Sequence, residues 1–168
     1  MSEIAKRQFV RQQGFGDASA AGCAYQYPAL MFQPRLLAAV VFLAILLQSA
    51  PIFLALGAIL WWNALIPRGN PFDALYNRAI AAPRNVPPLT PAPAPRRFAQ
   101  GMAGTFLVAA GLALLAARPG LAWIFEGLVA VALGALVLGR FCLGSYLYHL
   151  LRGETTFANR TLPWSRVE

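Results

Sequence analysis

The sequence predicts an all-α integral membrane protein with four transmembrane helices as two hairpins, short interfacial helices and a polar N-terminal tail. Two apolar blocks, residues 36–66 and 98–138, each exceed the roughly 20 residues that cross a hydrocarbon core of ~30 Å. The composition agrees, since 58% of the 168 residues are hydrophobic and only 12% are charged. A soluble domain carries about 25% charged residues.

We expect five segments along the chain. In order, these are a polar cytoplasmic tail (1–33), a first transmembrane hairpin with an interfacial helix (34–81), a Pro-rich linker (82–97), a second hairpin with a cytoplasmic helical extension (98–153), and a C-terminal tail (154–168).

The first apolar block contains one turn signal, the stretch from Gln48 to Pro51. Proline lacks a backbone N–H and suits the first turn of a new helix, so two arms are expected, 35–49 and 51–66. Each arm is short for a full crossing. A helix that begins earlier, near Ala29, with a kink at Pro34 would lengthen the first arm.

The second apolar block divides at Arg118-Pro119-Gly120, which is a turn sequence between spans 98–117 and 121–139. We expect helical sequence to continue to Arg152, where Gly153 offers a C-terminal stop.

A short helix is expected after the first hairpin. Asn70 can cap it, Pro71 fits its first position and Asp73 falls in its first turn, where acidic residues are favoured. Its apolar face would comprise Phe72, Leu75, Tyr76, Ala79 and Ile80. Such a helix lies on the cytoplasmic leaflet or docks a partner subunit. The linker that follows has six prolines between residues 83 and 95 and predicts a semi-rigid polyproline II segment.

Charge placement predicts the orientation. With four spans, Arg118 alone lies on the outer side, and the other 13 of the 14 basic residues share the inner side. The positive-inside rule then places both termini in the cytoplasm. The bias toward Arg and Ala is typical of a GC-rich bacterial genome, and we expect a bacterial inner membrane. The net charge of +8 is assigned to topology and anionic lipid, and not to nucleic acid, because no basic face or aromatic platform accompanies it.

Two stretches carry a family resemblance, Pro95 to Gly101 and Gly139 to Arg152, the latter with Phe141-Cys142-Leu143-Gly144. They resemble the bacterial domain-of-unknown-function 4395 family, with the best match over 95–152. The resemblance implies a small four-span membrane protein. Members usually have a second cysteine where this chain has Ser145, so a thiol-redox role implied by that C-x-x-C spacing would lack its second thiol here.

Three side chains are candidates for chemistry. Cys142, paired with Ser145 at i and i+3, is a possible thiol site or an inert structural cysteine, because serine cannot resolve a mixed disulfide. Glu126 is the acid inside a span, either functional or structural with Arg118 as a partner. His149 is the weak candidate for a cofactor ligand, with an interfacial hydrogen bond as the alternative. We predict no metal and no cofactor, and leave contact with a pigment or haem open.

Small residues predict close helix packing. Their spacing allows helix backbones to approach in lipid, either within the protein's own hairpin or against a larger membrane complex. These residues are Gly101, Gly104 and Gly111 in the third span, and Ala130, Gly134 and Gly139 in the fourth.

The leading functional expectation is a non-enzymatic accessory or scaffolding subunit of a larger bacterial membrane complex, photosynthetic or respiratory. It would be held by helix packing and cytoplasmic contacts, with lipid and other membrane subunits as partners. The alternative is a membrane thiol-redox or sulfur-handling protein that uses Cys142.

Overall fold

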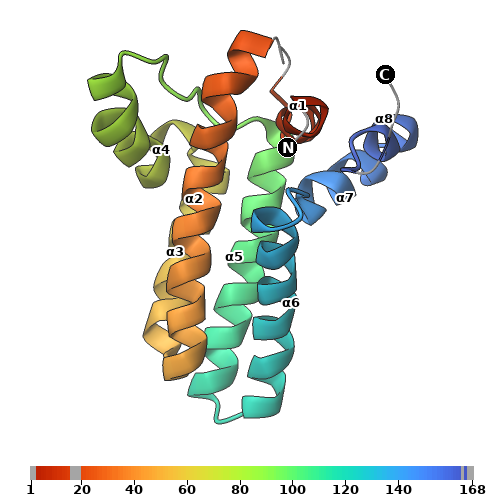
Figure 1. The fold of residues 1–168 in the computed structure, drawn as a ribbon. Coiled ribbons are helices and arrows are strands. Elements are labelled where there is room, and N and C mark those ends of the chain that lie inside the picture. Colours follow the sequence, from red (N-terminus) through yellow and green to blue (C-terminus); the bar gives the residue numbers. More distant parts are fainter. Residues whose placement is uncertain (1–2, 16–19, 164, 166–168) are drawn as a thin grey trace.

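The structure is a computed structural model that describes residues 3–15, 20–163 and 165. Long helices lie side by side as a bundle (Figure 1): α2 (Ala20–Leu47), α3 (Ala50–Leu65), α5 (Ala94–Leu115) and α6 (Pro119–Val137). Shorter helices gather at one end of it: α1 (Glu3–Gln12), α4 (Pro71–Tyr76), α7 (Leu143–Leu151) and α8 (Thr155–Arg160). Within the described ranges there is no strand, so the all-α prediction is confirmed.

Three helices are long and apolar enough to cross a membrane: Ala24–Leu47 within α2, α5 and α6. Between 22% and 33% of their apolar windows is buried inside the protein. Large side chains such as Phe42, Leu112 and Val131 are therefore exposed, as expected for surfaces that face lipid. The fourth long helix, α3, has 16 residues and is shorter than a standard span.

Both predicted turns are confirmed. α2 ends at Leu47, and α3 begins at Ala50 with Pro51 in its first turn. α5 ends at Leu115 and α6 begins at Pro119. The short helix expected after the first hairpin is also confirmed, as α4. Its cap is Asn70, whose side chain accepts hydrogen bonds from the backbone N–H groups of Phe72 and Asp73.

All four long helices contribute to the bundle core. Its buried members include Val41 of α2, Phe53 and Leu60 of α3, Leu107 of α5 and Val129 of α6. A second apolar cluster lies at the end where the short helices gather, and it joins α1, the first half of α2, the α4 region and the linker. Its buried members include Phe9, Met31, Tyr76 and Leu89.

The most extensive contact of α3 is with α5, and it has much less contact with α2, the helix that precedes it in the chain. Glycines explain this contact, because a Cβ added at Gly104 would lie 3.1 Å from the Gly57 carbonyl oxygen. A Cβ at Gly57 would lie 3.0 Å from the Gly104 oxygen in turn. Helices that approach this closely in lipid gain van der Waals contact and weak Cα–H···O bonds.

The predicted N-terminal tail, residues 1–33, is more structured than expected. It contains α1 and the first half of α2, which begins at Ala20 and continues through Pro28 and Pro34. The second apolar cluster accounts for this, since Tyr27 of α2 packs edge-on against Phe9 of α1 at 5.7 Å.

The predicted continuous helix from the last span to Arg152 is wrong. α6 ends at Val137, Arg140 has a left-handed φ of 54°, and a separate helix, α7, begins at Leu143. No proline marks this break. Gly153, with φ 74°, does follow the end of α7 as expected.

Candidate functional site

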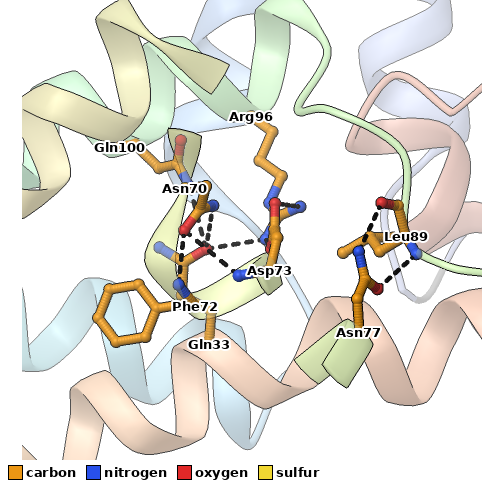
Figure 2. A network of polar contacts seen from close by, with 8 residues as sticks. All are labelled: Gln33, Asn70, Phe72, Asp73, Asn77, Leu89, Arg96 and Gln100. Atoms are coloured by element: carbon orange, nitrogen blue, oxygen red, sulfur yellow. Dashed lines mark hydrogen bonds and ion pairs between the residues drawn. The ribbon is translucent and has the colours of Figure 1, made fainter. Parts of the chain in front are cut away.

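Arg96 is the centre of a buried polar network at the end of the bundle where α5 begins (Figure 2). Its side chain is 5% exposed and forms a fork with the Asp73 carboxylate, through Nη2 to Oδ1 at 2.9 Å and Nη1 to Oδ2 at 3.4 Å. Arg96 Nη2 also donates to Gln33 Oε1 at 2.8 Å. A buried charge pair with this geometry links α5 to α4 and α2.

Three donors converge on the Gln33 amide oxygen. Besides Arg96, Gln100 Nε2 donates at 3.0 Å and Asn70 Nδ2 at 3.4 Å (Figure 2). The other end of the Gln100 amide, Oε1, is buried and has no hydrogen-bond partner among the described residues. Because an unpaired buried acceptor costs about 1–3 kcal/mol, Gln100 Oε1 is a candidate contact for a ligand.

A cavity of about 90 Å³, partly open to the surroundings of the bundle, lies next to this network and is lined by residues of α2, α3, α5, α6 and the start of α7. Gln33, Arg96, Gln100 and Cys142 line it at the end near the network. Apolar side chains line it deeper in the bundle, among them Leu37, Ala103, Phe106 and Val129. We call this space the Cys142 cavity.

Cys142 is fixed at the wall of this cavity by the break between α6 and α7. It occupies the N-cap position of α7, is 6% exposed, and its backbone N–H donates to Gln12 Oε1 of α1 at 2.9 Å. The Ser145 hydroxyl donates to the Cys142 sulfur at 3.3 Å. Cys142 is a free thiol; the side chain of Cys23 lies outside the described residues.

Close approach of α7 to α5 completes the wall. A Cβ added at Gly144 would lie 2.6 Å from the Ala99 Cβ and 2.7 Å from its Cα. Thus the stretch that begins at Pro95 and the stretch around Cys142, which carry the family resemblance, meet at one place in the fold.

His149 lies in the last turn of α7 and does not line the Cys142 cavity. Its Nδ1 is 2.6 Å from Glu154 Oε2, and its Nε2 is 3.2 Å from the Gln12 carbonyl oxygen. Both ring nitrogens thus have protein partners, which fits the interfacial hydrogen-bonding alternative better than a pigment or haem ligand. The hydrogen bond with His149 is the largest cause that lowers the pKa of the Glu154 carboxyl from its ordinary value.

Glu126 lies away from this site, toward the opposite end of the bundle. It is 4% exposed and accepts hydrogen bonds from Gln48 Nε2, at 3.1 Å to Oε2 and 3.4 Å to Oε1. Gln48 sits in the α2–α3 turn with a φ of 46°. The acid therefore links α6 to this turn, and its partner is Gln48 and not the Arg118 that the sequence analysis considered.

The small residues divide between two faces. On α5, Gly104 and Gly111 pack tightly on α3, and a Cβ at Gly111 would lie 2.8 Å from the Leu54 Cγ. The contact at Gly101 is looser, since a Cβ there would meet only Ala64, at 3.7 Å. On α6, a Cβ at Gly134 would have no neighbour within 4 Å among the described residues. Ala130 is exposed, and Gly139 lies in the α6–α7 break.

The polar network was missed in the sequence analysis, which assigned Arg96 to membrane topology and did not consider Gln33 or Gln100. One signal was available, because amide side chains within apolar helices need partners inside the protein. The identity of those partners depends on contacts between α2, α4 and α5, and no local sequence pattern reveals these contacts.

The fold and site define a class, an all-helical membrane protein with a buried polar network and a cavity lined in part by Cys142. Within that class, the chain belongs to the family described as domain of unknown function DUF4395, whose model matches residues 28–152. No curated protein and no solved structure matches the chain.

Proposed function

We propose that the protein crosses a bacterial inner membrane four times, with both termini in the cytoplasm. The three long helices are joined by α3, which runs beside them in the bundle (Figure 1) and at 1.5 Å per residue is about 24 Å long. Under this topology the described basic residues other than Arg118 lie on the cytoplasmic side; Arg166 lies outside the described residues.

We propose that the protein binds a small, largely apolar molecule in the Cys142 cavity, without catalysing its conversion. The observation that carries this proposal is that a cavity and an unpartnered buried acceptor, Gln100 Oε1, occur at the place where both family-like stretches meet. The apolar walls favour a ligand that partitions into lipid. Gln100 would accept a hydrogen bond from its polar end, beside the Cys142 thiol.

The cavity volume limits the ligand. At about 90 Å³, the cavity is smaller than the ~150 Å³ cavity that binds benzene in an engineered protein. It therefore suits a small molecule, or the head group of a longer one whose remainder lies between helices in the lipid. A hydroxyl, thiol or amide N–H on that group would satisfy Gln100 Oε1.

The test is to identify what the purified protein carries. Protein taken from native membranes in mild detergent is extracted with organic solvent, and the extract is analysed by mass spectrometry. We expect one compound in constant ratio to the wild type and little of it with Ala103→Phe, which fills the cavity. The matched control is Leu112→Phe, which adds the same ring to an exposed position of α5. Identical extracts from both variants would refute the proposal.

The thiol is tested in a Cys23→Ser background. A small membrane-permeant maleimide should label Cys142 more slowly in the occupied protein than after extraction, because the ligand lies against the sulfur. Equal labelling rates would place the ligand away from Cys142.

A role as an accessory subunit is the second candidate, and one observation favours it. The glycines Gly120, Gly127 and Gly134 of α6 leave open space where a Cβ would be, so another helix could approach this face. A tagged protein should then bring down a stoichiometric membrane complex, and the absorption spectrum of the eluate would reveal any pigment or haem. Gly134→Leu should release the complex and Ala103→Phe should retain it. Recovery of the protein alone would eliminate this role.

A further inference from the structure

A second hollow lies on the other side of α5, facing away from the Cys142 cavity. It is a groove of about 550 Å³ between α3 and α5, which we call the α3–α5 groove. Its lining residues include Trp61 and Leu65 of α3 and Arg97, Gly101 and Phe106 of α5. Its apolar surfaces are open to the surroundings of the bundle, since Trp61 is 41% and Leu65 is 66% exposed.

Arg97 is held at one end of this groove. Its Nε donates to the Ala64 carbonyl oxygen at 2.7 Å, which fixes the guanidinium against the end of α3. Among the described residues no acidic group pairs with it, in contrast to the neighbouring Arg96, whose charge is neutralised by Asp73. A half-buried, oriented guanidinium with free terminal N–H groups matches the oxygen atoms of a phosphate.

The rest of the groove matches an acyl chain in length and chemistry. Its α5 residues run from Ala94 to Phe106, a distance of about 18 Å at 1.5 Å per residue, against the ~15 Å depth of one leaflet core. Gly101 keeps the floor open, because a Cβ there would meet only Ala64, at 3.7 Å. Trp61 lies near the end of α3, at a position typical of the membrane interface.

We propose that the α3–α5 groove holds one anionic phospholipid, with its phosphate on Arg97 and an acyl chain along Gly101 and Phe106. Arg97 binds the phosphate, and its unpaired charge disfavours a head group that carries its own cation. The apolar groove selects a lipid over a free anion. This inference does not depend on a ligand in the Cys142 cavity, which is lined mainly by another face of α5, although Met102 and Phe106 border both spaces.

Native mass spectrometry of the detergent-purified protein tests the proposal. The protein is titrated with phosphatidylglycerol and with phosphatidylcholine of the same acyl chains. We expect one tightly retained phosphatidylglycerol, with an affinity about tenfold above that for phosphatidylcholine, because both lipids offer a phosphate but the choline cation of phosphatidylcholine is repelled by the Arg97 charge.

Two variants probe the two parts of the groove. Arg97→Gln should weaken phosphatidylglycerol binding and abolish its preference over phosphatidylcholine, whereas Gly101→Leu, which fills the groove without changing charge, should weaken both lipids and keep the preference. The matched control is Arg84→Gln, which removes an exposed charge from the linker and should leave binding unchanged. Melting curves without added lipid check that every variant is folded.

Three results would overturn the proposal. Equal losses with Arg97→Gln and Arg84→Gln would mean that net charge alone attracts the lipid. Binding of inorganic phosphate as tight as that of phosphatidylglycerol would mean an anion site without a lipid. A dimer that disappears with Gly101→Leu, while lipid binding is unchanged, would mean that a second copy of the chain covers the groove.

Discussion

At the scale of single residues, Arg96 and Asp73 show how a charge is kept inside the protein. Neither side chain exceeds 10% exposure, and their fork is completed by Gln33. A buried pair of this kind contributes little net stability compared with apolar residues, but it is costly to break. Because α2, α4 and α5 each supply a member of this network, we expect the pair to favour the arrangement of these helices in which all its groups are satisfied.

Asp73→Ala should therefore destabilise the fold strongly. It leaves the Arg96 charge buried without a counter-charge, and we expect a loss of about 3–5 kcal/mol, measured by denaturant unfolding in detergent with tryptophan fluorescence. Asp73→Asn, which keeps an acceptor, should cost less. The double variant Asp73→Ala/Arg96→Met should recover part of the loss, because no charge remains buried. An unchanged midpoint for Asp73→Ala would contradict this account.

The contact between His149 and Glu154 should make the docking of α8 sensitive to acid. The pKa of Glu154 is lowered from its ordinary value of 4.5, mainly by the hydrogen bond with His149. The folded state therefore favours the carboxylate. Its contribution is complete above about pH 4.5 and is lost as the pH falls through the lowered folded value.

A spin label at the exposed position 156 should report this change as increased mobility in acid. The label is introduced as Thr156→Cys in a background of Cys23→Ser and Cys142→Ser. In the matched variant Glu154→Gln the mobility should be independent of pH over the same range. A transition that persists in Glu154→Gln would assign the acid sensitivity to another group.

At the scale of helices, close approach depends on particular glycines and not on all of them. A Cβ at Gly144 would clash with the Ala99 backbone at 2.7 Å, whereas a Cβ at Gly127 would meet nothing within 4 Å. Equal substitutions at these two positions should therefore have opposite effects.

Gly144→Ala should destabilise the protein by about 1–3 kcal/mol, because α5 and α7 must move apart. Gly127→Ala should be neutral or stabilising by up to about 1 kcal/mol, because alanine is the better helix former. Thermal unfolding of both variants in one detergent provides the comparison. A destabilising Gly127→Ala would reveal a neighbour on that face.

The helices also show what can be predicted from sequence. Pro51 and Pro119 predict where α3 and α6 begin, because proline acts locally on the backbone. The break before α7 has no such local signal. Arg140 has a left-handed φ there, and two residues later the Cys142 N–H donates a hydrogen bond to Gln12 of α1, a contact that depends on the tertiary fold. Likewise, Gly104 predicts close packing, but its partner Gly57 belongs to the other apolar block.

The candidate site could be predicted only in part, for the same reason. Cys142 and Ser145 are neighbours along the chain, and their contact follows from the spacing. The Gln33–Arg96–Asp73 network joins residues up to 63 positions apart. Electrostatic pairing over that distance is decided by the tertiary fold, and an arginine beside an apolar span has an equally good explanation as a topology signal.

At the scale of the whole molecule, the number of crossings decides the sidedness of every loop. If α3 crosses, the linker is cytoplasmic and the α5–α6 turn is outside. If α3 does not cross and the N-terminus stays inside, these two segments exchange sides.

Single cysteines at Arg84 and Gly120, in a background without Cys23 and Cys142, should distinguish these topologies. An impermeant maleimide added to intact cells should label Gly120→Cys and spare Arg84→Cys until the membrane is opened. The reverse pattern would mean three crossings.

The hydrogen bonds of α1 to the C-terminal part of the chain can form only late in synthesis. Gln8 donates to the backbone and side-chain oxygens of Ser165, 157 residues later, and Gln12 accepts from Cys142, 130 residues later. A ribosome adds about 5–20 residues each second, so Gln8 waits roughly 8 to 30 s for its partner. The apolar side of α1, including Phe9 and Val10, packs instead in a cluster whose buried members end at Leu89, so most of its cover is made much earlier. A ribosome that stalls within the second apolar block would therefore leave α1 packed on α2 but without its hydrogen bonds to Cys142 and Ser165, and we expect the unfinished chain to hold α1 less firmly than the finished protein does.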